Sequence, residues 1–203
     1  NVVLIDGKEE GTFCFEDILE DGKRVPDEGL RAITPELDPD DDINIQYTSG
    51  TTGFPKGVTL THFNILNNGY HVAQAMRFTE ADCLCIPVPF YHCFGMVMSN
   101  ISCVSTGAKM VIPCPVFEPV PVFEAVGKEK CTALHGVPTM FIAELNLPDF
   151  EKYDLSTLRT GIMAGAPCPV KTMEEVIEKM NMKEVVIAYG QTEASPVTTM
   201  TRI

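Results

Sequence analysis

The sequence contains no tryptophan, few basic residues and no long hydrophobic run. Its 203 residues include 15 Lys and Arg against 28 Asp and Glu, so the formal net charge is −13. A chain this poor in cations offers no basic patch for a phosphate backbone, and we do not expect nucleic acid as a partner. None of its apolar stretches approaches the roughly 20 residues that cross a bilayer, so stable membrane insertion is not expected either.

The eight cysteines include no C-x-x-C pair. Several lie inside apolar segments, which is typical of small buried residues in a reducing compartment rather than of a disulfide framework or a zinc site. Cys83 and Cys85 would face the same side of a strand, as a metal clip or as alternate packing positions, and we favour packing. The cysteines indicate a cytoplasmic location. The mitochondrial matrix stays open, because a transit peptide would precede Asn1.

The acidic residues are concentrated at the N-terminal end. Residues 1–42 carry 14 acidic and 4 basic side chains, whereas the rest of the chain is nearly balanced. A cluster of carboxylates at residues 38–42 is either a cation site or a solvated run, and we favour the second because like charges repel. We therefore predict an acidic linker or edge segment over 1–42, with one short helix at most, and a domain over 43–203. Because the chain opens on Asn1 rather than Met, we expect it to be a piece of a longer protein.

From Ile43 onward the pattern is that of alternating strands and helices. Residues 43–47 alternate as a strand, a Gly- and Thr-rich loop follows, and Thr61 is a candidate N-cap for a helix over 62–76. Strand-length apolar runs then alternate with candidate helices near 93–105, 119–130, 138–146 and 169–181. The runs lie at 83–88, 109–112, 133–135, 160–164 and 185–189. This alternation predicts an α/β fold, a mostly parallel sheet with helices on both faces, and ligands at the carboxyl ends of the strands.

The loop over residues 48–57 has the composition of a phosphate cradle. Its glycines allow a close backbone approach, Lys56 supplies a positive charge, and hydroxyl groups supply donors. It differs from the Walker loop, which needs Ser or Thr directly after the lysine to hold magnesium, because Gly57 follows Lys56 here. The hydroxyl and glycine residues concerned are Thr48, Ser49, Gly50, Thr51, Thr52 and Gly53.

Residues 48–58 (TSGTTGFPKGV) resemble the signature loop of the AMP-forming adenylating enzymes. Residues 89–95 (PFYHCFG) resemble the aromatic-gate segment of fatty acyl-CoA synthetases, and residues 189–193 (YGQTE) the Y-G-x-T-E nucleotide motif. Residues 165–167 are similar to the stretch that lines the adenine. The resemblance covers nearly the whole chain, as the middle of the large N-terminal domain. When residues 42–46 and 195–198 are also considered, the chain most resembles the medium-chain fatty acyl-CoA synthetases.

The resemblance implies an ATP-dependent ligase that activates a fatty acid. The acid and ATP would give acyl-adenylate and pyrophosphate, and CoA would then displace AMP to give acyl-CoA. In this family the residues matching Thr48 to Thr52 and Lys56 hold the β- and γ-phosphates, and Gly53 belongs to the same nucleotide-binding loop. The residue matching Glu193 holds Mg²⁺, and the one matching Thr192 bonds the α-phosphate. Tyr189 and Gly190 would lie against the adenine. Its opposite wall would be formed by Gly165, Ala166 and Pro167.

On the acid side, the resemblance makes His92 the gate that admits the carboxylate. His135 and Gly136 would line the acyl tunnel, although an ordinary buried histidine is an equal alternative. Residues 94–101 are either an adaptable tunnel wall or plain helix core. The gate segment carries no carboxylate, so the α-ammonium group of an amino acid would be buried unpaired, which disfavours an amino-acid substrate.

Two parts of the family's active site do not occur in this sequence. They are the lysine of the small C-terminal domain and the aspartate that binds the ribose. We therefore expect residues 1–203 alone to be unable to complete turnover. The alternatives are an aryl-acid or luciferase-like adenylating enzyme, and a non-catalytic nucleotide-binding module. Acyl chain length is not predicted, and a homodimer is left open.

Overall fold

The computed structural model describes residues 2–49 and 53–203. Contacts divide the chain into two compact units, one up to Asp41 and one from Asp42 to Ile203. Each unit has its own strands and helices, and each is described by itself.

The N-terminal unit contains more helix than the sequence suggested. Strands β1 (Val3–Leu4) and β2 (Phe13–Cys14) pair in parallel, and helices α1 (Phe15–Gly22), α2 (Asp27–Ile33) and the 3₁₀ turn η1 (Thr34–Glu36) follow. Several of the acidic residues fall in the first turns of α1 and α2, where the helix dipole favours negative charge. Among the described residues of this unit only Cys14 is buried, so it has almost no core of its own.

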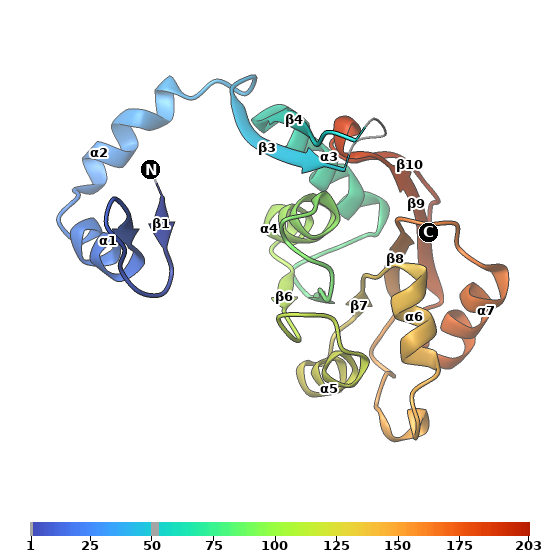
Figure 1. Cartoon of the computed structure of the whole chain (residues 1–203). Coiled ribbons are helices and arrows are strands. Elements are labelled where there is room, and N and C mark those ends of the chain that lie inside the picture. Colours follow the sequence, from blue (N-terminus) through green and yellow to red (C-terminus); the bar gives the residue numbers. More distant parts are fainter. Residues whose placement is uncertain (1, 50–52) are drawn as a thin grey trace. The chain divides into compact units, whose positions relative to one another are not determined.

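The second unit is built on a six-stranded sheet with the order β10-β9-β8-β7-β5-β6 (Figure 1). The five strands from β5 to β9 run parallel, and β10 pairs antiparallel with β9 at one edge. This confirms the predicted α/β fold with a mostly parallel sheet. The strands are β5 (Cys83–Cys85), β6 (Lys109–Val111), β7 (Ala133–Leu134), β8 (Thr160–Ala164), β9 (Glu184–Gly190) and β10 (Val197–Met200).

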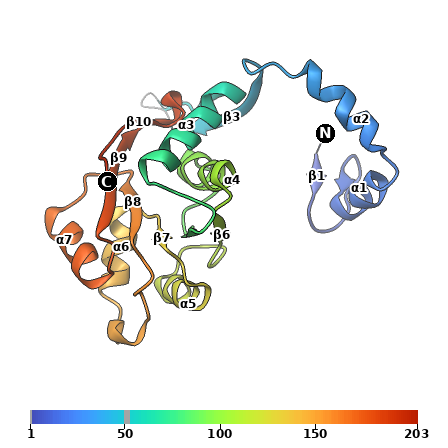
Figure 2. The ribbon, with the colours of Figure 1, turned by 180° about the vertical axis from the view of Figure 1, so that it is seen from behind.

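Helices cover both faces of this sheet, as predicted. One buried cluster joins Leu84 of β5 to α3 and η2, and another joins Cys83 and Cys85 to α5, α6 and α7. The two cysteines therefore share one face as packing residues. Helix α6 stands nearer the viewer in Figure 1 and α3 in Figure 2. The bounds are α3 (His62–Ala75), the π-helix η2 (Phe94–Ile101), α4 (Ser102–Thr106), α5 (Pro119–Glu129), α6 (Pro138–Leu145), the 3₁₀ turn η3 (Phe150–Lys152) and α7 (Val170–Lys179). No helix in the described ranges is both long and apolar enough to span a membrane.

A separate hairpin precedes α3. Strand β3 (Asp42–Thr48) pairs antiparallel with β4 (Lys56–Thr61), and the register sets Thr48 opposite Lys56. The predicted strand at 43–47 is present, but β4 was not anticipated, because its Gly, Thr and Lys content reads as loop. The N-cap prediction is confirmed: Thr61 Oγ1 accepts a hydrogen bond from the Asn64 N–H, and Asn64 Oδ1 accepts one from the Thr61 N–H, both at 3.2 Å.

An ion pair between the buried Asp82 and the partly exposed Arg159 joins the amino ends of the strands. Asp82 Oδ1 accepts hydrogen bonds from Thr132 Oγ1 at 2.7 Å and from Arg159 Nε at 3.0 Å, and Oδ2 accepts one from the Thr79 N–H at 2.9 Å. Arg159 also donates to the carbonyl of Met76 at 3.3 Å, just after α3. Burial alone would raise the pKa of Asp82, but the hydrogen bonds from Thr132 and Thr79 and the Arg159 charge together lower it.

We expect Asp82→Asn to lower the free energy of unfolding at pH 7 by about 2 kcal/mol, because it removes the charged acceptor of hydrogen bonds from Arg159, Thr132 and Thr79. Arg159 keeps its ion pair with Glu184 in the variant. The pKa of Asp82 is lower in the folded chain than in the unfolded one. Its stabilising effect is therefore complete above the ordinary value of about 3.9 and is lost as the pH falls through the folded value. Urea unfolding of the chain between pH 2 and 7 should accordingly show that the free energy of unfolding falls less with decreasing pH in the variant than in the parent.

The matched control is Asp154→Asn. Asp154 is also ion-paired, to Lys130 at 2.7 Å, but it is exposed to solvent. Its loss should cost far less stability at pH 7. Equal losses in the two variants would contradict a special role for the buried Asp82 carboxylate.

Candidate active site

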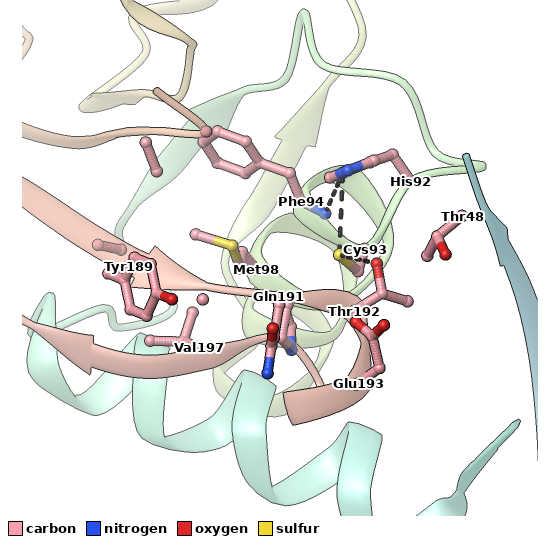
Figure 3. Close-up of a pocket in the computed structure, with 15 residues that line it drawn as sticks. Thr48, His92, Cys93, Phe94, Met98, Tyr189, Gln191, Thr192, Glu193 and Val197 are labelled. Atoms are coloured by element: carbon pink, nitrogen blue, oxygen red, sulfur yellow. Dashed lines mark hydrogen bonds between the residues drawn. The ribbon is translucent and has the colours of Figure 1, made fainter. Parts of the chain in front are cut away.

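A cavity of about 320 Å³ opens beyond the carboxyl ends of β8 and β9. Figure 3 shows its lining side chains, which come from the β3 end, the 92–98 segment and the turn after β9. This is the edge of the sheet where the parallel strands predict a ligand. Seven of the residues predicted from the sequence line the cavity: Thr48, His92, Gly165, Tyr189, Gly190, Thr192 and Glu193.

The turn after β9 is bent back tightly on itself. Gly190 is required there, because a Cβ atom at this position would collide with the Pro196 carbonyl. The Gln191 N–H donates to the same carbonyl oxygen at 3.0 Å, and the 3₁₀ turn η4 (Thr192–Ala194) lies between. Thr192 and Glu193 therefore stand on a short closed loop directly beyond the end of a core strand, at the rim of the cavity.

The hairpin brings the predicted phosphate lysine next to this rim. Thr48 ends β3 and lines the cavity, and Lys56 begins β4 as its cross-strand neighbour. Lys56 is exposed and does not itself line the cavity, and neither do the exposed Ser49 and Gly53. The predictions for Gly50, Thr51 and Thr52 lie outside the described residues.

The gate segment touches the nucleotide motif through a thiol. Cys93 Sγ lies 3.7 Å from Thr192 Oγ1 and 3.8 Å from His92 Nδ1 (Figure 3). The backbone N–H of Phe94 donates to His92 Nδ1 at 3.0 Å. Because Nδ1 accepts that bond, the neutral ring carries its proton on Nε2. Desolvation lowers the pKa of His92, which keeps the ring neutral.

The inner end of the cavity is apolar. Phe94 and Met98 of η2 face it together with Val197 of β10, and both η2 side chains are buried. Of the two methionines within residues 94–101, Met98 lines the cavity. Met96 turns instead to the hairpin, where Gln46 Nε2 is 3.6 Å from its Sδ.

Sequence reasoning missed Cys93 and Val197 as lining residues. Cys93 had a local signal, since it lies between His92 and Phe94 in the gate segment. Val197 lies within residues 195–198, whose only signal in the sequence is the family resemblance. Neither residue type announces a binding role by itself.

Several predicted residues lie apart from the cavity lining. His135 is fully buried, with Nδ1 at 3.1 Å from Ser99 Oγ and with the Phe94 ring centroid 5.6 Å away, and burial lowers its pKa to about 3. Gly136 is buried beside it, while Ala166 and Pro167 are exposed beyond Gly165. The structure thus has the buried histidine that was the alternative. The roles predicted for these residues on the acyl tunnel and the adenine wall stay predictions.

The donor set suits a magnesium ion that arrives with a polyphosphate. Within residues 2–49 and 53–203 no three His, Cys, Asp or Glu side chains group to hold a metal. The cavity offers one carboxylate, Glu193, beside the Thr192 hydroxyl. Mg²⁺ is commonly held in this way, by one or two carboxylates together with substrate phosphates and water.

A mostly parallel sheet with a cavity beyond the carboxyl ends of its strands is typical of the class of α/β proteins that bind ligands at this edge. Within that class, residues 4–203 match the family model of the AMP-binding enzymes, and the chain belongs to this family.

Its relatives are acyl-CoA synthetases. The chain is 60% identical over 192 residues to the putative acyl-CoA synthetase YngI of Bacillus subtilis (strain 168), which covers 95% of this chain and 35% of that protein. It is 42% identical over 199 residues to the mitochondrial medium-chain acyl-CoA ligase ACSF2 of Danio rerio, covering 97% and 33%. The chain thus spans about a third of the length of these relatives.

A solved structure shares the fold. The crystal structure of ATP-bound MatB from Rhodopseudomonas palustris superposes with a TM-score of 0.71 at 32% sequence identity. The match covers 82% of this chain and 32% of MatB. The likeness therefore extends over most of the chain.

We expect His92 to titrate below the ordinary imidazole value of about 6.5, because desolvation disfavours its charged form. ¹⁵N NMR across pH 4–8 should show the tautomer protonated on Nε2, and His92→Gln assigns the resonance. A midpoint at or above the ordinary value, or a proton on Nδ1, would contradict the geometry described above.

Proposed function

We propose that the whole protein to which this chain belongs activates a fatty acid with ATP and transfers it to CoA. The observation that supports this most is the single cavity at which Thr48, His92, Thr192 and Glu193 meet, with Lys56 on the adjacent strand. These residues come from three separate segments, each with a family motif: residues 48–58, 89–95 and 189–193. Their meeting at one edge of the sheet is what adenylation chemistry requires.

In the first half-reaction, a carboxylate oxygen of the acid attacks the α-phosphorus of ATP. The bond from that phosphorus to the bridging oxygen breaks, and pyrophosphate leaves with the electron pair. Lys56 and the hydroxyls of the 48–52 loop would neutralise the charge that accumulates on the leaving group, and Thr192 would hydrogen-bond the α-phosphate. Mg²⁺, when bound with ATP, adds further neutralisation, and Glu193 would hold it.

The adenine would lie between Tyr189 and residues 165–167. Tyr189 lines the cavity, and its side chain is 68% exposed, which leaves a flat ring free to stack. Gly165 begins the opposite wall directly after β8.

The acid would enter past His92. Its neutral ring carries an Nε2–H group that can donate to the carboxylate without an ion pair. The alkyl chain would lie against Phe94, Met98 and Val197. The gate segment, residues 89–95, carries no carboxylate to pair with the α-ammonium group of an amino acid. A medium-chain fatty acid is the proposed substrate, and one relative carries the name of a medium-chain ligase. The aryl acids remain the alternative.

In the second half-reaction, the CoA thiol attacks the acyl carbon and AMP leaves. We propose that residues 1–203 alone do not complete this cycle, since the relatives are about three times as long. We also propose a cytoplasmic location, which the eight free thiols favour, with the mitochondrial matrix as the alternative.

Lys56→Ala and Glu193→Ala in the whole protein should each reduce octanoate-dependent ATP–pyrophosphate exchange by about 100-fold or more, because each removes charge compensation in the transition state. Lys183→Ala and Glu178→Ala, at exposed positions away from the cavity, are matched controls and should exchange normally. A double variant at Lys56 and Glu193 that still exchanges at the parental rate would refute the proposed site.

Acyl preference should respond to Met98 and not to Met96. In a series of acids of different chain length, we expect octanoate to support faster ATP–pyrophosphate exchange than longer fatty acids or benzoate. Met98→Ala should raise the exchange rate with longer acids, relative to the rate with octanoate, by about tenfold, because the smaller side chain deepens the apolar end. Met96→Ala, whose side chain faces the hairpin, is the control. A flat response to chain length would undo the medium-chain assignment, and faster exchange with benzoate would favour an aryl-acid enzyme.

A further inference from the structure

The loop that carries Thr192 and Glu193 ends at the edge of the sheet. Val197 begins β10, which is an edge strand paired only with β9 in the described sheet. The outward N–H and C=O groups of an edge strand have no ladder partner, and such groups need another partner or water. At Val197 both groups have found one.

That partner is the side-chain amide of Asn68 in α3. Asn68 Oδ1 accepts a hydrogen bond from the Val197 N–H at 3.1 Å, and Asn68 Nδ2 donates to the Val197 carbonyl at 2.9 Å. The same Nδ2 group lies 3.5 Å from the carbonyl of Ala194, the last residue of η4. One amide therefore occupies the place that a neighbouring strand would fill, and it contacts the loop at Ala194 and the start of β10 at Val197.

Asn68 is itself held firmly by α3. Gly69, its neighbour, lies so close to η2 that a Cβ atom there would collide with the Ile101 side chain. Ser102 Oγ donates to the Gly69 carbonyl at 2.8 Å, and Val72 is buried in the core on the same helix. The clamp on Val197 is thus fixed to the packed body of the domain.

The same continuous segment carries the phosphate lysine. Lys56 begins β4, β4 runs to Thr61, and the capping box at Thr61 passes the chain directly into α3. No loop separates the strand from the helix. The position of Lys56 and the position of the clamp are therefore linked through two regular elements.

We propose that Asn68 is a positioning residue that keeps the two halves of the phosphate site in register. It fixes the loop bearing Thr192 and Glu193 to the helix that extends from the lysine-bearing strand. The clamp holds the backbone of Val197, whose side chain also lines the apolar end, so we expect a smaller effect on the acid than on the nucleotide. The inference rests on the proposed function, and it assigns Asn68 to nucleotide and magnesium binding rather than to acid binding.

Asn67 provides a matched control. It precedes Asn68 in the same helix and is also partly buried, but its Nδ2 donates to the Phe63 carbonyl at 2.8 Å, within its own helix. Replacing Asn67 removes an equal amide without touching the loop.

The test compares Asn68→Ala, Asn68→Asp and Asn67→Ala in the whole protein. Both Asn68 variants should raise the KM for ATP in pyrophosphate exchange by about tenfold and shift the Mg²⁺ requirement upward, because two backbone hydrogen bonds are lost or opposed by a carboxylate. The KM for octanoate should rise much less than the KM for ATP, and Asn67→Ala should behave as the parent. Asn68→Asp is nearly isosteric and answers the question if Asn68→Ala does not fold.

The outcomes separate the inference from the proposed function. If no carboxylic acid supports pyrophosphate exchange by the parent protein, the proposed function is overturned. Equilibrium binding of Mg²⁺–ATP then tests the role of Asn68 without any acid. Asn68 variants that match Asn67→Ala in both ATP binding and the KM for ATP overturn the inference. So does an equal rise in the KM values for ATP and octanoate, which would indicate general structural damage.

Discussion

The pairing of Asp82 with Arg159 is the constraint on which the arrangement of the second unit depends. The two side chains gather the end of α3 and the starts of several parallel strands into one hydrogen-bonded network. Glu184, at the start of β9, accepts from the same guanidinium at 3.0 Å. With the amino edge closed by side chains, the carboxyl edge is left to carry the loops, and the lining of the cavity is drawn from those loops.

At that carboxyl edge, contacts between uncharged groups position the residues that are proposed to bind charged ligands. Cys93 bridges the gate and the nucleotide motif, and Asn68 joins the nucleotide loop to α3. The charged groups themselves, Lys56 and Glu193, remain exposed at the rim. This division suits a site whose strongest electrostatic partners are supplied by the ligand, since unpaired charges held in the interior would be costly without it.

The sequence predicted the sheet well because buried parallel strands leave near-continuous apolar runs, and the cap at Thr61 because capping is local. It placed the motif residues at one edge because each follows a strand. It did not predict β4, whose composition resembles a loop, or the two N-terminal helices, whose acidic residues suggested only repulsion. Asn68 could not be found, because its contact joins residues 129 positions apart with no local pattern. Cys93 lies in the gate segment, but its contact with Thr192 spans 99 positions and could not be predicted.

The π-helical geometry of η2 has a further consequence for the wall of the cavity. A π-helix contains more residues per turn than an α-helix, so its side chains fan out at a different angular step. Removing one residue from this segment would allow an ordinary α-helix and would rotate every later side chain by about 100° around the axis. Met98 would then leave the wall and another side chain would replace it. Segment length, and not only the identity of its amino acids, therefore encodes which atoms face the interior.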